Sequence, residues 1–229
     1  MNNEQMLQYF EMMKKVFRPH PWHGVDLYSK EDKSELNAYI ELVPDDSVKY
    51  ELHKESGYLI VDRPQKFSNF FPALYGLLPK TYSGDKVAAY TNELLGRTDL
   101  VGDCDPTDIC VLTEKHIAHG DLLVNCIPIG GFRMIDGGEV DDKIVAVLKD
   151  DALYGHIKDV KDCPESILNR LKHYFLTYKE IPTGTKSAKV EITHLYGAEE
   201  AKKIIALSEE DYSDKYDLEY LKKKVNFHL

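Results

Sequence analysis

The sequence predicts an α+β protein, with a mainly β middle section flanked by helices. Apolar and polar residues alternate with a period of two in several short stretches between residues 37 and 148. Apolar residues recur at helical spacing near both ends of the chain, and Gly- or Pro-containing turns separate the expected strands. We expect one domain over residues 1–229, with an N-terminal helical extension (1–35), an insertion (80–101) and a C-terminal helix or tail (210–229).

The N-terminal part predicts one helix and then a group of strands. The helix covers residues 4–18, its apolar face is expected to pack rather than to bind a cofactor, and Pro19 ends it. The strands expected next are 37–43, 48–53 and 58–62. The turn KESG before the third strand places Gly57 where a positive φ is needed.

Charged residues inside these strands are the first candidates for a site. Lys49 and Glu51 lie on one face of their strand because side chains alternate, and Glu41 lies in the strand before. Alone, such charges would be a solvent-facing cross-strand pair. In a barrel, the same alternation could line a polar cleft.

An acidic loop follows the insertion, in which we expect a short helix near residues 92–95. The sequence GDCDPTDICVL (102–112) places Asp103, Asp105 and Asp108 within six residues, and Pro106 favours a loop over a paired strand. Three neighbouring carboxylates repel each other unless a cation compensates, and Mg²⁺ prefers such oxygen ligands. A solvated acidic turn is the alternative interpretation. The thiol of Cys104 is too soft for magnesium and is expected to point away.

A second acidic loop lies between later strands. The strands expected here are 109–113, 122–129 and 143–148, with a bulge or bend at Gly130-Gly131. Asp136, Glu139 and Asp141 form the loop, which Lys143 follows. Two acidic loops at strand ends indicate one shared site at a barrel mouth.

The C-terminal part predicts two further helices and a short strand. A helix is expected from Pro164 to about Lys179, with Asp162 or Cys163 as its cap. A loop and a strand ending at Thr193 follow, and a second helix is expected over 198–209.

Composition excludes several classes of partner. The formal net charge of −10 argues against nucleic-acid binding, which requires a basic surface. The sequence has no apolar run of the roughly 18 residues that a membrane span needs, and no signal-peptide core, so we expect a cytoplasmic protein. The four cysteines have no zinc-finger spacing and are not expected to form disulfides.

Several motifs, in order along the chain, resemble the soluble family I inorganic pyrophosphatases. The signature is DCDPTDI (103–109), which has the form D-x-D-P-x-D followed by an aliphatic residue. The flanking matches are IELVP (40–44), KYEL (49–52), KESGYLIVDRP (54–64), FPALYG (71–76), HIKDV (156–160) and HYFLTYK (173–179).

The resemblance implies an OB-like five-stranded closed barrel that hydrolyses pyrophosphate to two orthophosphates, an activity of phosphate metabolism, with several Mg²⁺ ions per site. It implies Asp105 as the general base. The metal ligands it implies are Asp103, Asp108, Asp136, Asp141, Glu41 and Glu51. The phosphate contacts it implies are Lys49, Arg63, Tyr75, Lys143, Tyr178 and Lys179. It also implies a homo-oligomer and leaves dimer or hexamer open.

Two other functions match the acidic loop less well. DCDPT fits the DxDxT motif of haloacid-dehalogenase-type phosphatases, in which Asp103 would form an aspartyl phosphate, but that motif follows a buried parallel strand. A non-catalytic calcium module would place Asp103, Asp105 and Glu114 at loop positions 1, 3 and 12, but the glycine required at position 6 is Asp108.

Overall fold

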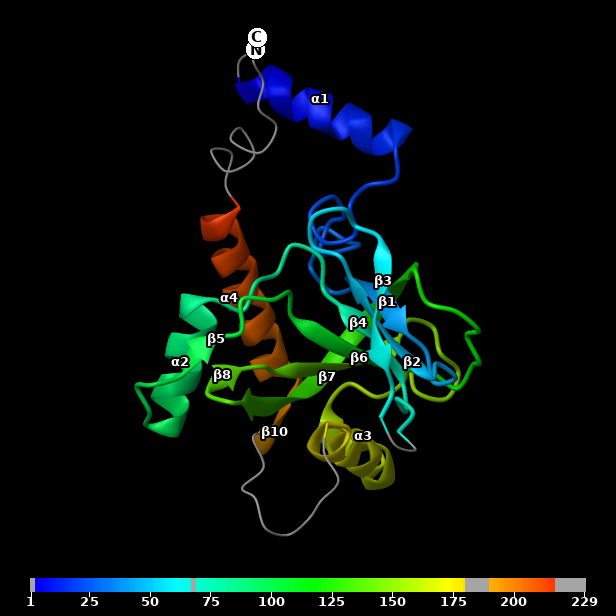
Figure 1. The fold of residues 1–229 in the computed structure, drawn as a ribbon, viewed down its shortest axis with the longest axis vertical. Helices are drawn as coiled ribbons and strands as arrows, with labels where there is room; N and C mark the ends of the chain where they lie inside the picture. The colour runs from blue at the N-terminus through cyan, green and yellow to red at the C-terminus, as the bar shows by residue number, and fades with distance from the viewer. Residues whose placement is uncertain (1–2, 67–68, 180–189, 217–229) are drawn as a thin grey trace.

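The computed structural model describes residues 3–66, 69–179 and 190–216, and its ribbon is shown in Figure 1. The α-helices are α1 (Asn3–Val16), α2 (Asp85–Leu95), α3 (Glu165–Thr177) and α4 (Ala198–Lys215), and a 3₁₀ turn, η1, covers Val160–Asp162. The strands are β1 (Leu36–Leu42), β2 (Val48–Leu52), β3 (Leu59–Pro64), β4 (Leu74–Leu77), β5 (Val101–Gly102), β6 (Asp108–Leu112), β7 (Leu122–Asp136), β8 (Glu139–Val140), β9 (Lys143–Leu148) and β10 (Val190–Gly197). The prediction of a mainly β protein with flanking helices is confirmed.

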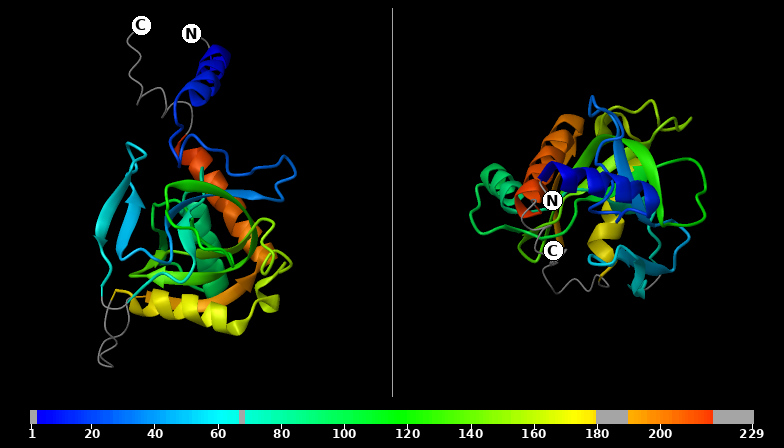
Figure 2. Two further views of the ribbon diagram at one scale, coloured as in Figure 1. Left: turned by 90° about the vertical axis from the view of Figure 1, so that its right-hand side faces the viewer. Right: turned by 90° about the horizontal axis from the view of Figure 1, so that it is seen from above.

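The main sheet is organised around five strands. Pairing runs from β1 through β4, β6 and β9 to β7, and β7 pairs back onto β1. β10 extends the sheet on β7, whereas β2 and β3 form a separate hairpin that stands beside it (Figures 1 and 2). The β6–β9 pair is parallel, and the other four pairs of the ring are antiparallel.

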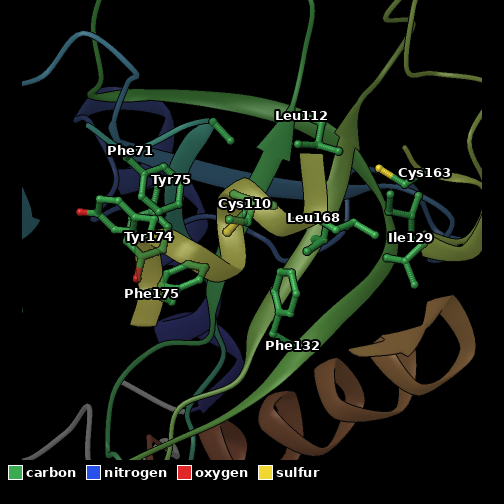
Figure 3. Packing of buried hydrophobic residues seen from close by; sticks show 14 of the residues in the cluster. Phe71, Tyr75, Cys110, Leu112, Ile129, Phe132, Cys163, Leu168, Tyr174 and Phe175 are labelled. Carbon is green, nitrogen blue, oxygen red and sulfur yellow. The ribbon is translucent and has the colours of Figure 1, made fainter. Parts of the chain in front are cut away.

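The central strands are buried on both faces. One face of β6 and β9, with Cys110 and Val145, packs with α3 in a cluster that contains Phe71, Leu168 and Phe175 (Figure 3). The other face packs into a second cluster with apolar residues of α4. Burial on both faces explains why these strands read as uninterrupted apolar runs.

Several expected boundaries are corrected by long-range pairing. The strand expected to end at Ile129 continues as β7 to Asp136, with a register shift between Pro128 and Gly130 where a bulge was expected. β10 extends four residues beyond the predicted end at Thr193 because it pairs along β7.

Two helices are longer than expected. The helix near 92–95 begins already at Asp85, and α4 continues to Lys215.

The helix ends also differ from expectation. Pro164 itself is the N-cap of α3 and makes no side-chain capping bond, so the predicted cap at Asp162 or Cys163 is wrong. α1 forms where expected and lies beyond the end of the sheet in Figures 1 and 2. Phe17, expected to pack, is 61% exposed. Most of the expected C-terminal tail, from residue 217, lies outside the described residues, as does the stretch 180–189.

Candidate active site

The two acidic loops meet because one parallel strand pair precedes Asp103 and Asp141 and a second parallel pair follows them. Gly102 of β5 pairs with Val140 of β8, so the residues that follow, Asp103 and Asp141, emerge side by side. The next parallel pair begins with Asp108 of β6 opposite Lys143 of β9. A β-carbon on Gly102 would lie 2.2 Å from the carbonyl oxygen of Ser83, so only glycine permits this approach.

Both loops open into one cleft of about 250 Å³. All but one of the site residues expected from the sequence line it. Those lining it are Glu41, Lys49, Glu51, Tyr75, Asp103, Asp105, Asp108, Asp136, Asp141, Lys143, Tyr178 and Lys179. Arg63 is the exception: its guanidinium lies 5.9 Å from the centroid of the Tyr178 ring, at the edge of the site, and bonds to Asp62.

Lysines neutralise several of the carboxylates. The Lys143 ammonium bonds to both Asp108 and Asp141, and Lys179 bonds to Asp136. Burial alone would lower the pKa of Lys143, but the two carboxylates raise it well above its usual value. The same balance raises the pKa of Lys179 beside Asp136. Both ammonium groups are therefore charged at neutral pH.

Lys49 lies on the separate β2–β3 hairpin and forms a similar pair. Its ammonium lies 3.0 Å from Glu51 Oε2 and 3.1 Å from Asp62 Oδ2. Burial favours the neutral amine, but these two carboxylates raise the pKa of Lys49 overall. The hairpin thus brings a third side chain that is positively charged at neutral pH to the cleft.

Other carboxylates lack enough positive charge nearby. Burial, with repulsion from Asp141, raises the pKa of Asp103 to about 9. Burial and the charge of Asp108 raise the pKa of Glu41 to about 8, although Glu41 Oε1 accepts a 2.7 Å bond from the Leu52 amide. A cation bound next to Asp103 or Glu41 would favour the ionised carboxylate and lower its pKa.

Asp105 lies in the same acidic loop, opposite the turn before β3. Its side chain is held by the ammonium of Lys54. Burial raises the pKa of Asp105, and the Lys54 pair opposes that rise. A carboxylate of this kind titrates closer to neutrality than a free aspartate, which suits a general base.

Two tyrosines form the aromatic wall. The hydroxyl of Tyr75 donates to Asp108 Oδ2 at 2.5 Å, and burial, followed by the charge of Asp108, raises its pKa well above 10. Tyr75 therefore remains a protonated donor. Tyr178 stacks on Tyr174 with ring centroids 5.0 Å apart, and Tyr174 packs with Phe71 in the cluster of Figure 3. The aromatic wall is thus an extension of the α3 core.

The donor set fits a hard divalent cation. Eight carboxylates but only four lysines line the cleft, so its formal charge is negative, and an anionic substrate would be repelled without added cations. Oxygen donors of this kind suit Mg²⁺. Among the residues that the structure describes, no three acidic, histidine or cysteine side chains form a ready-made metal cage, because lysines occupy the carboxylates.

Lys54 and Glu139 are cleft residues that sequence reasoning missed. Lys54 stands first in KESGYLIVDRP, so its position in a family motif was the available signal. Glu139 lies in the second acidic loop but had no assigned role. Cys104 lines a separate hollow outside the cleft and is exposed, so the prediction that it points away is confirmed.

The surroundings of the acidic loops do not favour the two alternative functions. β5 and β6 flank the first loop, whereas a calcium-binding EF-hand loop is flanked by helices. The dehalogenase-type motif requires a buried strand before Asp103, but β5 has only two residues and Val101 is exposed.

Residues 38–213 match the sequence profile described as inorganic pyrophosphatase. The chain is 56% identical over 196 residues to the inorganic pyrophosphatase of Chlamydia muridarum, with 84% of this chain and 93% of the relative covered. It is 32% identical over 221 residues to the soluble inorganic pyrophosphatase of Oryza sativa subsp. indica, with coverage of 96% and 91%. The crystal structure of type I inorganic pyrophosphatase from P falciparum superposes with a TM-score of 0.72 at 26% identity, covering 90% of this chain and 68% of that one.

Proposed function

Since the chain belongs to the soluble family I inorganic pyrophosphatases and hydrolyses pyrophosphate to orthophosphate, we propose which of its residues carry out the reaction. Asp105 is the general base that takes a proton from the attacking water. The proposal is supported by its position at the centre of the acidic loop and by the opposing effects of burial and Lys54 on its pKa.

Six other carboxylates of the cleft hold the metal ions on which this family depends, and we propose Mg²⁺ as the metal. The ligands are Asp103, Asp108, Asp136, Asp141, Glu41 and Glu51. Bound Mg²⁺ lowers the pKa of water and screens the charge of the phosphoryl oxygens. The excess of carboxylates over lysines in the cleft is the observation that carries this assignment.

The cationic and phenolic side chains bind the phosphate groups. Lys49, Lys143 and Lys179 are charged at neutral pH, and each is already held in the cleft by a carboxylate. Their charge-assisted bonds to phosphate oxygens strengthen as negative charge develops on the leaving group. Tyr75 and Tyr178 add hydroxyl groups from the aromatic wall, and Arg63 completes the set from the edge of the cleft.

The five-stranded ring of the main sheet supports a more specific fold assignment. We propose that the ring β1–β4–β6–β9–β7 is an OB-like closed barrel and that residues 1–229 form one domain. We further propose that the protein acts in the cytoplasm as a homo-oligomer. No helix of the described residues is long and apolar enough to cross a membrane. Light scattering after gel filtration measures the oligomeric state.

Phosphate release from pyrophosphate tests the assignment. With Mg²⁺, the wild-type protein is expected to turn over, and EDTA should abolish turnover. Asp105→Asn should lower kcat by about 10²–10⁴-fold while Mg²⁺ binding is retained. Asp99→Asn is the matched control because Asp99 is exposed and lies outside the cleft. Near-normal turnover by Asp105→Asn would remove that residue from the role of base.

A further inference from the structure

Ser83 connects the two acidic loops from behind the cleft. Its backbone amide donates to the carbonyl of Asp105 at 2.8 Å, and its own carbonyl accepts from the Cys104 amide at 3.1 Å. Its hydroxyl donates to the carbonyl of Val140 at 3.0 Å. The residue is buried, so water does not replace these bonds. One residue therefore touches the first acidic loop through its backbone and the second through its side chain.

The hydroxyl bond lies next to the point where the loops meet. Val140 immediately precedes Asp141 and pairs with Gly102, which immediately precedes Asp103. The parallel pair β6–β9 holds the loops together after the two ligands, but on the side that precedes Asp103 and Asp141 the pair β5–β8 has only two residues in each strand. The Ser83 hydroxyl adds a third point of attachment to this short pairing.

α4 in turn fixes the position of Ser83. The amide of the preceding Tyr82 donates to the carbonyl of Ser208 at 2.9 Å. The buried carboxylate of Asp211 accepts from the amides of Gly84 at 3.1 Å, Lys86 at 3.0 Å and Val87 at 3.1 Å. The N-cap Gly84 has no side chain to cap α2, so Asp211 caps it from another helix.

We propose that Ser83 is a positioning residue that holds Asp103 and Asp141 at the separation needed to share metal ions. The inference deepens the proposed function and rests on it. Ser83 does not line the cleft and does not touch substrate; it acts through the backbone of the residues next to the two ligands.

Equilibrium binding of Mg²⁺ to the metal-free protein, measured by calorimetry without pyrophosphate, tests the proposal. Ser83→Ala removes only the hydroxyl bond and is expected to weaken Mg²⁺ binding about two- to tenfold, the effect of losing one hydrogen bond. The concentration of Mg²⁺ that gives half-maximal turnover should rise by a similar factor, and saturating Mg²⁺ should restore kcat.

Ser208→Ala is the matched control. Ser208 is also buried, and its hydroxyl donates to a backbone carbonyl at 2.9 Å, but that carbonyl belongs to Ile205 in the same helix. The control should lose similar thermal stability in EDTA and keep wild-type Mg²⁺ affinity. Ser83→Thr, which retains a hydroxyl, should bind Mg²⁺ more tightly than Ser83→Ala.

Unchanged Mg²⁺ affinity in Ser83→Ala, or equal weakening in Ser208→Ala, would overturn the proposal. If Ser83→Ala does not fold, Asp211→Asn is the variant that tests the proposal. The asparagine amide replaces one of the carboxylate oxygens that accept from the α2 amides beside Ser83. Asp211→Asn should therefore also weaken Mg²⁺ binding, and wild-type Mg²⁺ affinity in this variant would refute the inference. An inactive Asp105→Asn together with unaltered Mg²⁺ binding by Ser83→Ala would refute the positioning role alone. Full activity of Asp105→Asn would instead refute the proposed base.

Discussion

Replacing Asp103 by asparagine should make the metal-free protein more stable and the Mg²⁺-loaded protein less active. Burial and the neighbouring Asp141 raise the pKa of Asp103 to about 9 in the folded protein, against 3.8 for an unperturbed aspartate. At pH 7 the unfolded chain therefore carries an ionised Asp103 and the folded chain a protonated one. Folding is therefore coupled to the binding of one proton, and this binding costs more free energy as the proton concentration falls.

The difference between pH 7 and the unperturbed pKa sets the size of the effect. At about 1.4 kcal/mol for each pH unit, the full penalty at pH 7 is about 4 kcal/mol. Asp103 keeps partial contact with solvent, which reduces the figure, so we expect Asp103→Asn to gain about 2–4 kcal/mol in its free energy of unfolding. The penalty is absent below about pH 4 and grows as pH rises, so the gain at pH 5 should be about 1 kcal/mol.

Urea unfolding in EDTA at pH 5 and pH 7 measures both values. Asp99→Asn is the control, because Asp99 is exposed and its hydrogen bond with Arg97 lowers its pKa. That variant should show no gain at either pH. Saturating Mg²⁺ should stabilise the wild-type protein more than Asp103→Asn. A loss of metal-free stability in Asp103→Asn, or a gain independent of pH, would refute the electrostatic reasoning.

Three other substitutions test separate parts of the site. Lys54→Met removes the charge that opposes the raised pKa of Asp105, so the acidic limb of the pH–kcat/KM profile should move to higher pH; an unmoved limb would count against the pair. Lys179→Ala should raise KM for pyrophosphate several-fold and leave urea unfolding unchanged, and unchanged kinetics would contradict its role. Arg133→Met removes the buried cation that lies 3.7 Å from the buried carboxylate of Asp142 and 2.8 Å from Glu200 of α4, and it should cost about 3–5 kcal/mol in urea unfolding; a loss below 1 kcal/mol would contradict the importance of these ion pairs.

The sequence predicted elements whose cause is local. β6 and β9 are buried on both faces, and their apolar runs are unambiguous. The turn at Gly57, with φ of +71°, was recognised because glycine tolerates that conformation. The end of β10 was misjudged because β10 continues as far as its pairing with β7 does; α4 begins at Ala198 as expected but continues to Lys215, beyond the predicted end at residue 209. No local signal records the length of such a pairing.

In the candidate site, too, residues within a local motif were predicted and residues linked by long-range contacts were missed. Asp103, Asp105 and Asp108 were recognised because they lie within one short motif. Lys54 was missed because its link to Asp105 joins residues 51 positions apart. Ser83 could not be recognised from the sequence, because its partners are backbone groups of the two loops and no side-chain motif identifies them.

The lysine–carboxylate pairs explain how one cleft can bind both cations and an anion. In the metal-free protein, Lys143 neutralises Asp108 and Asp141, and Lys179 neutralises Asp136. A divalent cation that binds these carboxylates takes over their neutralisation, which leaves the ammonium groups available to phosphate oxygens. Cation binding and phosphate binding should therefore reinforce each other, since each releases the partner that the other requires. Lys143→Met should weaken this coupling: the Mg²⁺ dependence of KM for pyrophosphate should flatten, and an unchanged dependence would show that the pair does not mediate it.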